Sequence, residues 1–170
     1  VHDIGEPGIL FGHRELRVYP NGSLASHILG GAGFNNESAV GADIVGRAGV
    51  EASFDQFLRD PSRHGEPLQL SIDLSIQAAT ERVLAGGMDL LGAKGASSIV
   101  MDVKTGEVIS MVSLPNFDPN RRPGVLKSGD PSNSPLFNRA VQGVYELGST
   151  FKTFTAAKAL DLELVNPETV

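Results

Sequence analysis

A short polar segment, residues 60–67, divides the sequence into two parts with different patterns. It contains two prolines and a glycine, residue types that mark turns and loops more often than any others. Before it, residues 1–66 are rich in glycine and hold only short apolar runs, as in a loop-rich or extended region. After it, longer periodic runs favour regular helices and strands. The 170 residues therefore fit parts of two domains that meet near this segment.

The first part predicts few regular elements. Turn signals at Pro7-Gly8 and at Pro20-Asn21-Gly22 enclose an extended stretch over residues 9–19. Short helices are expected over residues 24–29 and 50–58, the second because its apolar side chains fall on one helical face. We expect residues 30–46, which include Gly30-Gly31-Ala32-Gly33, to form an irregular connection.

The second part predicts a strand, a long helix and a hairpin. Residues 68–72 alternate apolar and polar side chains, as a strand does, and Asp73 can cap a helix that runs to about residue 91. Two β-rich runs, residues 98–103 and 108–113, surround a glycine-containing turn and predict a hairpin. The helix is expected to bury Ile76, Ala79, Val83, Leu84 and Met88. Together these elements indicate an α+β fold.

A long loop over residues 115–135, rich in proline, asparagine and glycine, should separate the hairpin from a last helix at residues 148–160.

The composition excludes several kinds of function. A net charge of −6 argues against a nucleic-acid-binding protein. The sequence has no cysteine, and its four histidines show no metal-ligand spacing, so we assign no metal and no cofactor. No apolar stretch approaches the roughly 20 residues of a membrane span, and no signal peptide is visible. We therefore expect a segment of a longer protein.

The strongest chemical signal is Ser149-x-x-Lys152 in the last predicted helix. Residues three apart on a helix share one face, so the lysine amine can reach the serine hydroxyl. A serine is a poor nucleophile until a nearby base takes its proton. A lysine can do this only in its neutral form, which desolvation and a cationic neighbour favour. By itself this short pattern is more often a helix-capping serine followed by a solvated lysine.

The surrounding residues point to a family. Tyr145-Glu146-Leu147-Gly148-Ser149-Thr150-Phe151-Lys152 resembles the nucleophile segment of penicillin-binding proteins, with Leu147 where class B members usually have proline. Three upstream segments resemble parts of the same catalytic domain: Asn138-Arg139, Leu114-Pro115-Asn116-Phe117-Asp118-Pro119-Asn120 and Asp102-Val103-Lys104-Thr105-Gly106-Glu107-Val108. The start of that domain is matched by Leu70-Ser71-Ile72-Asp73.

Two boxes in the first part resemble the pedestal, or dimerisation, domain of class B penicillin-binding proteins. Arg17-Val18-Tyr19-Pro20-Asn21-Gly22 is similar to an R-x-Y-P-x-G box, and Gly46-Arg47-Ala48-Gly49-Val50-Glu51 to a G-x-x-G-x-E box. We expect Arg17, Tyr19, Pro20, Gly22, Gly46, Gly49 and Glu51 to be structural, with an ion pair between Arg17 and Glu51. The resemblance implies that residues 1–66 are the C-terminal part of the pedestal and residues 67–170 the start of the transpeptidase domain.

The resemblance also implies a function. Ser149 would attack the D-alanyl-D-alanine carbonyl of a peptidoglycan stem peptide, with Lys152 as general base, and a β-lactam would acylate the same serine. The whole protein would lie in the bacterial periplasm, anchored to the inner membrane, and would meet proteins of the division or elongation machinery. The Gram-negative cell-division type fits best, and the elongation type stays open.

The companion motifs of the family, S-x-N and K-T-G, are not found after Ser149, so we expect these 170 residues to be inactive by themselves. Lys104-Thr105-Gly106 spells K-T-G but precedes the serine, and we interpret it as a hairpin turn. The family's first pedestal box and membrane anchor would precede Val1. The last helix presents Phe151, Phe154, Thr155 and Ala159 for burial, so we expect a dimer, a swapped arrangement or burial by further residues of the longer protein.

Two alternatives remain. One is a non-catalytic interaction module, in which residues 1–66 bind partners in the division machinery. The other is a serine β-lactamase or sensor domain that shares S-x-x-K, which the pedestal boxes disfavour.

Overall fold

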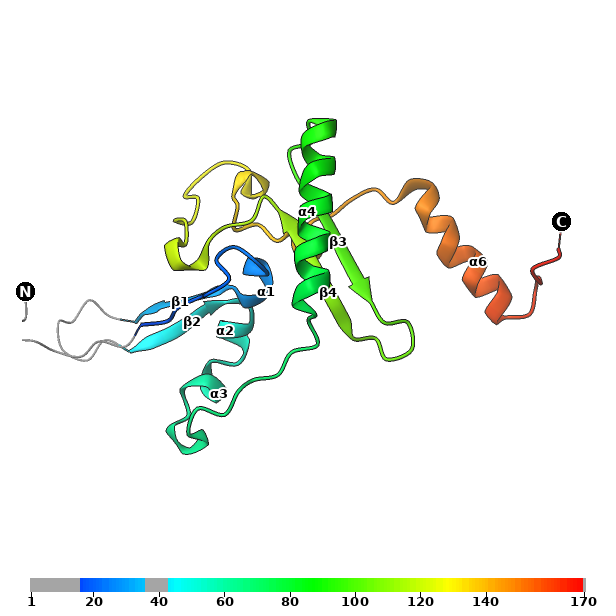
Figure 1. Ribbon diagram of the computed structural model, residues 1–170. Coiled ribbons are helices and arrows are strands. Elements are labelled where there is room, and N and C mark those ends of the chain that lie inside the picture. The colour runs from blue at the N-terminus through cyan, green and yellow to red at the C-terminus, as the bar shows by residue number, and fades with distance from the viewer. Residues whose placement is uncertain (1–15, 36–42, 170) are drawn as a thin grey trace, which may run out of the picture.

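A computed structural model gives the fold, and the description below covers residues 16–35 and 43–169 (Figure 1). The molecule is α+β: two separate two-stranded antiparallel sheets are accompanied by short helices and by one long helix. Pro7-Gly8 and most of the stretch predicted over residues 9–19 lie outside the described residues.

The first part holds a small hairpin and four short helical segments. In order they are α1 (Ser26–Leu29), β1 (Gly31–Phe34), β2 (Ile44–Ala48), α2 (Gly49–Ser53), α3 (Asp55–Arg59) and the 3-10 helix η2 (Pro61–Arg63). The predicted first helix is confirmed. The prediction of an irregular connection over residues 30–46 is wrong at both ends of this range. There β1 and β2 form an antiparallel pair in which Ala32 lies opposite Gly46. Its sequence hid the strands because glycine has a low strand propensity. The second predicted helix is divided at Phe54 into α2 and α3.

The second part is more regular. It contains α4 (Leu74–Leu91), β3 (Ala96–Met101), β4 (Val108–Leu114), η3 (Pro119–Arg121), η4 (Pro131–Asn133), α5 (Arg139–Gln142), η5 (Gly148–Phe151) and α6 (Lys152–Asp161). The Asp73 carboxylate accepts hydrogen bonds from the N–H groups of Ser75 and Ile76, which confirms the predicted cap. The hairpin, the long loop and the last helix are confirmed as well.

The strand predicted over residues 68–72 is wrong. This segment is coil, and two hydrogen bonds join it and the next residue to β4: Ser71 Oγ donates to the Val108 carbonyl at 2.7 Å and the Asp73 N–H to the Ile109 carbonyl at 2.9 Å. The helix that begins at Leu74 ends the contact before a ladder can form. At the next position on this edge of β4, the backbone of Met111 forms hydrogen bonds with the Gln77 side chain of α4.

The face that α4 buries also differs from the prediction. Ile76 and Val83 are 40% and 76% exposed, whereas Gln77 is fully buried against β4. Its amide joins four groups at once, because Nε2 donates to Glu81 Oε1 and the Met111 carbonyl, while Oε1 accepts from Ser110 Oγ and the Met111 N–H. A buried polar group with all its hydrogen bonds made is tolerated in a core. The prediction is wrong for Ile76, Ala79 and Val83, which are exposed, and holds in part for Leu84 and Met88, which are half-buried on the same side of the helix as Gln77.

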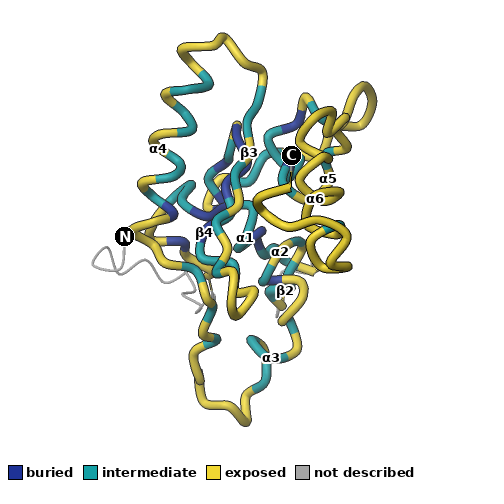
Figure 2. Tube along the Cα trace, turned by 90° about the vertical axis from the view of Figure 1, so that its right-hand side faces the viewer, coloured by how far each residue is buried: buried dark blue, intermediate teal, exposed yellow. Residues whose placement is uncertain are grey.

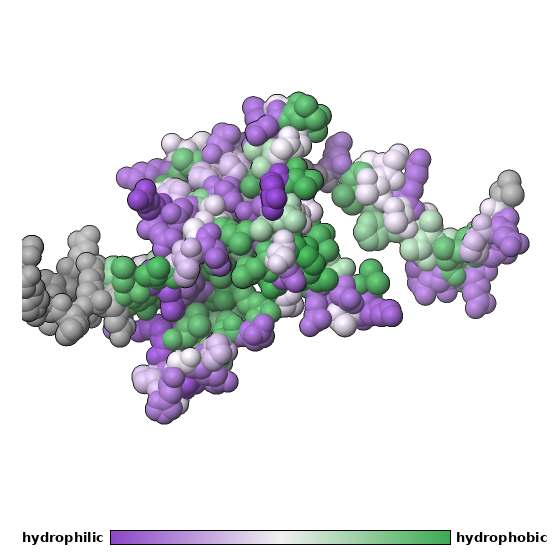
Figure 3. Space-filling view, in the orientation of Figure 1, coloured by the Kyte–Doolittle hydropathy of each residue, from purple (hydrophilic) through white to green (hydrophobic). Residues whose placement is uncertain are grey.

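Buried residues concentrate where the two parts meet. They lie in and around β4, α1 and α2 (Figure 2). Helix α3 has no buried residue, and α6, which stands clear of the rest of the molecule in the space-filling view, is almost wholly exposed (Figure 3). After α5 an extended stretch leads away from the rest of the molecule to α6, which lies apart from the other elements (Figure 1). Its Phe151 and Phe154 side chains are 57% and 63% exposed, so the burial expected for them is absent here. Among the described residues, no helix combines the length and apolarity needed to cross a membrane.

Candidate functional site

The Ser149-x-x-Lys152 pattern occupies one helical turn at the start of α6. The 3-10 helix η5 contains Ser149, and the Lys152 N–H donates to the Ser149 carbonyl. In a 3-10 turn, residues three apart lie one above the other. The backbone thus sets the two side chains on the same side of the helix. Gly148, directly before the serine, has φ 52°, a left-handed conformation that glycine adopts without strain.

Both side chains of the pair face solvent. Ser149 and Lys152 are exposed, and within the described ranges no hydrogen bond joins the Ser149 hydroxyl to the Lys152 amine. The extended stretch before them is exposed as well, with Tyr145 at 60% and Leu147 at 49%. The turn therefore brings Ser149 and Lys152 to one side of the helix, and both side chains stay in contact with solvent.

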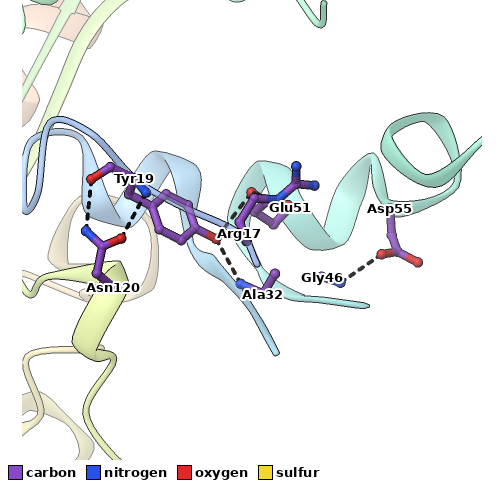
Figure 4. A network of polar contacts seen from close by, with 7 residues as sticks. All are labelled: Arg17, Tyr19, Ala32, Gly46, Glu51, Asp55 and Asn120. Carbon is purple, nitrogen blue, oxygen red and sulfur yellow. Dashed lines mark hydrogen bonds and ion pairs between the residues drawn. The ribbon is translucent and has the colours of Figure 1, made fainter. Parts of the chain in front are cut away.

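The two pedestal boxes meet in a compact polar cluster around Glu51 (Figure 4). Arg17 Nε lies 3.0 Å from Glu51 Oε1, so the predicted ion pair is confirmed. The Tyr19 hydroxyl donates to the same oxygen at 3.2 Å and accepts the Ala32 N–H at 3.0 Å. Glu51 is 8% exposed, and its charge is compensated by the guanidinium on one side and the phenol on the other. The cluster therefore ties the segment before α1 to β1 and α2.

The remaining box residues shape the backbone around this cluster. The Gly22 N–H donates to the Tyr19 carbonyl at 3.1 Å, which closes a turn with Pro20 at the position where its fixed φ is favourable. At Gly46 a Cβ would lie 1.9 Å from the Glu51 carbonyl oxygen, so only glycine lets β2 approach α2 this closely. At Gly49 it would lie 2.5 Å from the Ile28 carbonyl oxygen, and φ is 60°. These four positions have local steric reasons.

The electrostatics of the cluster follow from burial and its hydrogen bonds. Burial, together with the neighbouring Glu51 carboxylate, raises the pKa of Tyr19 to about 12, so the phenol stays protonated and can donate. Nearby, Asp55 Oδ1 accepts the Gly46 N–H at 2.7 Å, and this hydrogen bond lowers the pKa of the Asp55 carboxyl. The donors and acceptors are thus fixed in one arrangement at neutral pH.

The cluster continues into the second part of the chain. The Asn120 side chain pairs with the Tyr19 backbone in two directions: Oδ1 accepts the Tyr19 N–H and Nδ2 donates to the Tyr19 carbonyl, both at 2.9 Å. On α4, Glu81 Oε1 accepts the Ala25 N–H at 3.0 Å, and Asn116 Nδ2 donates to Glu81 Oε2 at 3.2 Å. Tyr19 of the first box and Ala25, just before α1, therefore take part directly in the contact between the two parts of the molecule.

Comparison with known proteins identifies both parts. Residues 2–63 match the penicillin-binding protein dimerisation domain, and residues 96–170 match the penicillin-binding protein transpeptidase domain. The order of the two domains agrees with the order of the boxes along the chain.

The chain belongs to the class B penicillin-binding proteins. It is 38% identical to the probable peptidoglycan D,D-transpeptidase FtsI of Caulobacter vibrioides, over 95% of this chain and 25% of that protein. It is 30% identical to the peptidoglycan D,D-transpeptidase FtsI of Escherichia coli and 30% identical to MrdA of Acinetobacter baumannii, over 96% and 94% of this chain and 29% and 28% of those proteins. The chain thus spans about a quarter of the length of the curated relatives it matches, and its family is that of the peptidoglycan D,D-transpeptidases.

In this penicillin-binding protein segment, the pedestal boxes and the Ser149–Lys152 pair lie in separate places. The pedestal boxes lie at the junction near α2, whereas Ser149 and Lys152 lie on the projecting η5–α6 segment (Figure 1). Lys104-Thr105-Gly106 is a hairpin turn as predicted: the Asp102 carboxylate accepts the N–H groups of Lys104 and Thr105, and Gly106 has φ 76°.

Sequence reasoning missed two polar residues of α4: Gln77, which holds α4 to β4, and Glu81, which accepts the Ala25 N–H of the first part. Their spacing of four puts them on one helical face, and that spacing was the available signal. Asp118 and Asn138, which lie in the motifs that resemble the family, accept backbone N–H groups at the starts of η3 and α5. Both therefore have local structural roles.

Proposed function

We propose that this segment carries the nucleophile of a peptidoglycan D,D-transpeptidase, with Ser149 as the nucleophile and Lys152 as its general base. The observation that supports this most directly is the single turn that places both residues on one side of the start of α6. Free backbone N–H groups at a helix start also favour negative charge on a serine oxygen.

The chemistry is an acyl transfer in two steps. The Ser149 hydroxyl oxygen attacks the carbonyl carbon between two D-alanines of a stem peptide, and its proton passes to the Lys152 amine. The C–N bond then breaks, D-alanine leaves with that proton, and an ester with Ser149 remains. An amine of a neighbouring stem peptide attacks the ester and restores the serine. A β-lactam carbonyl would acylate Ser149 in the same way.

We further propose that the 170 residues have no useful activity by themselves. Support comes from the exposure of Ser149 and Lys152, because no other part of the described chain encloses the two side chains or a bound substrate. An active site needs several groups held in place together, and the turn supplies only two of them.

Labelling with a fluorescent penicillin, read by mass spectrometry, tests these proposals. In the full-length protein we expect one adduct on the peptide that contains Ser149, lost in Ser149→Ala and strongly reduced in Lys152→Gln. Lys158→Gln, an exposed lysine on the same helix, is the matched control and should label normally. Labelling of Ser149→Ala to the same extent would refute the assignment. Stoichiometric labelling of the isolated 170 residues would refute their inactivity.

For the domains, we propose that residues 1–66 belong to the dimerisation domain and residues 67–170 to the transpeptidase domain. Support comes from α4, which the dense Gln77 contacts join to β4. The whole protein would act in the periplasm at the inner membrane in septal synthesis, a role suggested by the similarity to proteins named FtsI; the similarity to MrdA supports the elongation machinery as the alternative. A homodimer through the exposed face of α6 is part of the same proposal.

A non-catalytic function of residues 1–66 is the second candidate. The ordered cluster around Glu51 favours it, because a rigid surface next to the catalytic domain suits the binding of division-complex proteins. Pull-down with residues 1–66 and with a Ser149→Ala full-length protein distinguishes binding from catalysis.

A further inference from the structure

A cavity of about 400 Å³ lies between the two domains, away from Ser149. Its volume falls in the range of pockets that hold small organic molecules. Apolar side chains from both domains form most of its wall: Ile28, Val50 and Phe54 from the dimerisation domain, and Met111, Leu136 and Val141 from the transpeptidase domain. A ligand in this cavity would therefore touch both domains at once.

One cation lines the cavity without a counter-ion. Arg122 Nε is buried with no hydrogen-bond partner, and within the described ranges no nitrogen of this side chain takes part in a hydrogen bond or an ion pair. The guanidinium lies 5.9 Å from the centre of the Phe117 ring. No aspartate or glutamate is among the described residues that line the cavity. A half-buried charge without a partner is costly, and an anion would offset this cost.

Two side-chain amides of the cavity wall can donate to a ligand. Asn138 Oδ1 and Gln142 Oε1 already accept the backbone N–H groups of Ala140 and Asn138, at 3.1 Å and 2.8 Å, which leaves both side-chain NH₂ groups for a ligand. His27 Nε2 donates to the Pro135 carbonyl oxygen at 2.9 Å, so its hydrogen is already used, and the Ser53 hydroxyl can donate or accept. A wall that offers donors and one cation is complementary to a group that only accepts, such as a carboxylate.

We propose that this interdomain cavity binds a monocarboxylate with an apolar body. The carboxylate pairs with the Arg122 fork and the two amides, and the apolar body fills the space between Val50, Phe54 and Val141. A single negative charge is favoured over a doubly charged phosphate, because the described wall provides one permanent cation. This site is independent of the catalytic roles proposed for Ser149 and Lys152.

Methionine methyl NMR provides the test, because the sequence has three methionines and only Met111 lines the cavity. The probes are biphenyl carboxylate and its neutral isostere, biphenyl carboxamide, titrated into the full chain. We expect the carboxylate to shift the Met111 methyl signal saturably and to leave Met88 and Met101 unchanged. The carboxamide and the Arg122→Gln protein should each bind roughly ten- to a hundredfold more weakly, the effect of losing a charge-assisted hydrogen bond.

Arg121→Gln is the matched control, because Arg121 is the exposed neighbour of Arg122 and does not line the cavity. It should bind the carboxylate as the parent chain does. Val141→Trp fills the cavity from an exposed position and should abolish the Met111 shift without unfolding the protein. An unchanged Met111 signal, or equal affinities of Arg122→Gln and the parent chain, would overturn the site. Equal affinities for carboxylate and carboxamide would overturn the choice of an anion.

Discussion

Tyr19 uses both its backbone and its phenol to join three segments of the chain. Its hydroxyl satisfies the Ala32 N–H and one oxygen of Glu51, while its backbone pairs with Asn120 (Figure 4). Tyr19→Phe keeps the ring but leaves the Ala32 N–H without a partner. We expect the free energy of unfolding to fall by about 1–2 kcal/mol, measured by urea denaturation. Tyr145→Phe, at an exposed tyrosine, should change it little.

His27 gives the domain junction a pH dependence. Burial lowers the pKa of its imidazole, as does the nearby Arg139 cation, while the Pro135 carbonyl and Glu81 act in the opposite direction. The unfolded chain then binds a proton that the folded chain does not, so stability rises with pH in this range. We expect neutral His27 to contribute its full stabilisation to the folded chain above the unfolded pKa of about 6.5. The free energy of unfolding should fall as the pH drops below this value.

Urea unfolding of His27→Gln at neutral and mildly acidic pH measures this contribution. Its free energy of unfolding should fall less on acidification than that of the parent chain. His64→Asn is the control, because His64 is exposed and asparagine accepts its left-handed backbone, φ 50°. If the two variants have the same pH dependence, His27 does not carry it.

At the scale of elements, Gln77 binds helix α4 to β4 in place of a third strand. Its amide satisfies the N–H and the carbonyl of Met111 on the edge that β3 does not cover. Gln77→Leu preserves the volume but leaves these groups and Ser110 Oγ without partners. We expect a loss of about 3 kcal/mol in the free energy of unfolding, because unsatisfied buried polar groups are among the costliest changes. Gln56→Leu on exposed α3 should have little effect, and a similar loss in both variants would contradict this account.

Elements with strong local signals were predictable from the sequence, and elements set by distant contacts were not. The Asp73 cap, the hairpin turn at Gly106 and the start of α6 depend on residues that lie within a few positions of one another. The strands β1 and β2 depend on pairing across residues 36–42, and glycine at Gly31 and Gly33 gives them no local signal. The buried face of α4 is set by Met111, 34 positions away from Gln77.

The candidate site divides in the same way. The predicted Arg17–Glu51 ion pair is present, and the close approach of the Glu51 carbonyl oxygen gives a steric reason for glycine at position 46. The roles of Ser149 and Lys152 stay predictions, because their chemistry depends on surroundings that one helical turn does not provide. Arg122 was not predicted, since its importance comes from a cavity whose walls lie far apart in the sequence.

For the whole molecule, the decisive contact is the one between the domains. The Asn120 side chain binds the Tyr19 backbone much as a neighbouring strand would, with one donor and one acceptor. The two residues are 101 positions apart in the sequence. Such a contact couples the opening of one domain to that of the other, because the Tyr19 N–H exchanges only when the pair separates. Asn120→Ala removes both hydrogen bonds without affecting the Glu51 cluster. We therefore expect faster hydrogen exchange at the Tyr19 amide, by roughly five- to tenfold for a loss of about 1 kcal/mol.

Exchange at the Ala32 amide, which Tyr19 Oη accepts, should change less, because that hydrogen bond lies within the dimerisation domain. Asn133→Ala is the control, since Asn133 is exposed on η4 and makes no contact with Tyr19. Faster exchange at Tyr19 in both variants would show a general loosening of the long loop. Faster exchange in Asn120→Ala alone would place the coupling of the two domains at the Tyr19 backbone in this one side chain.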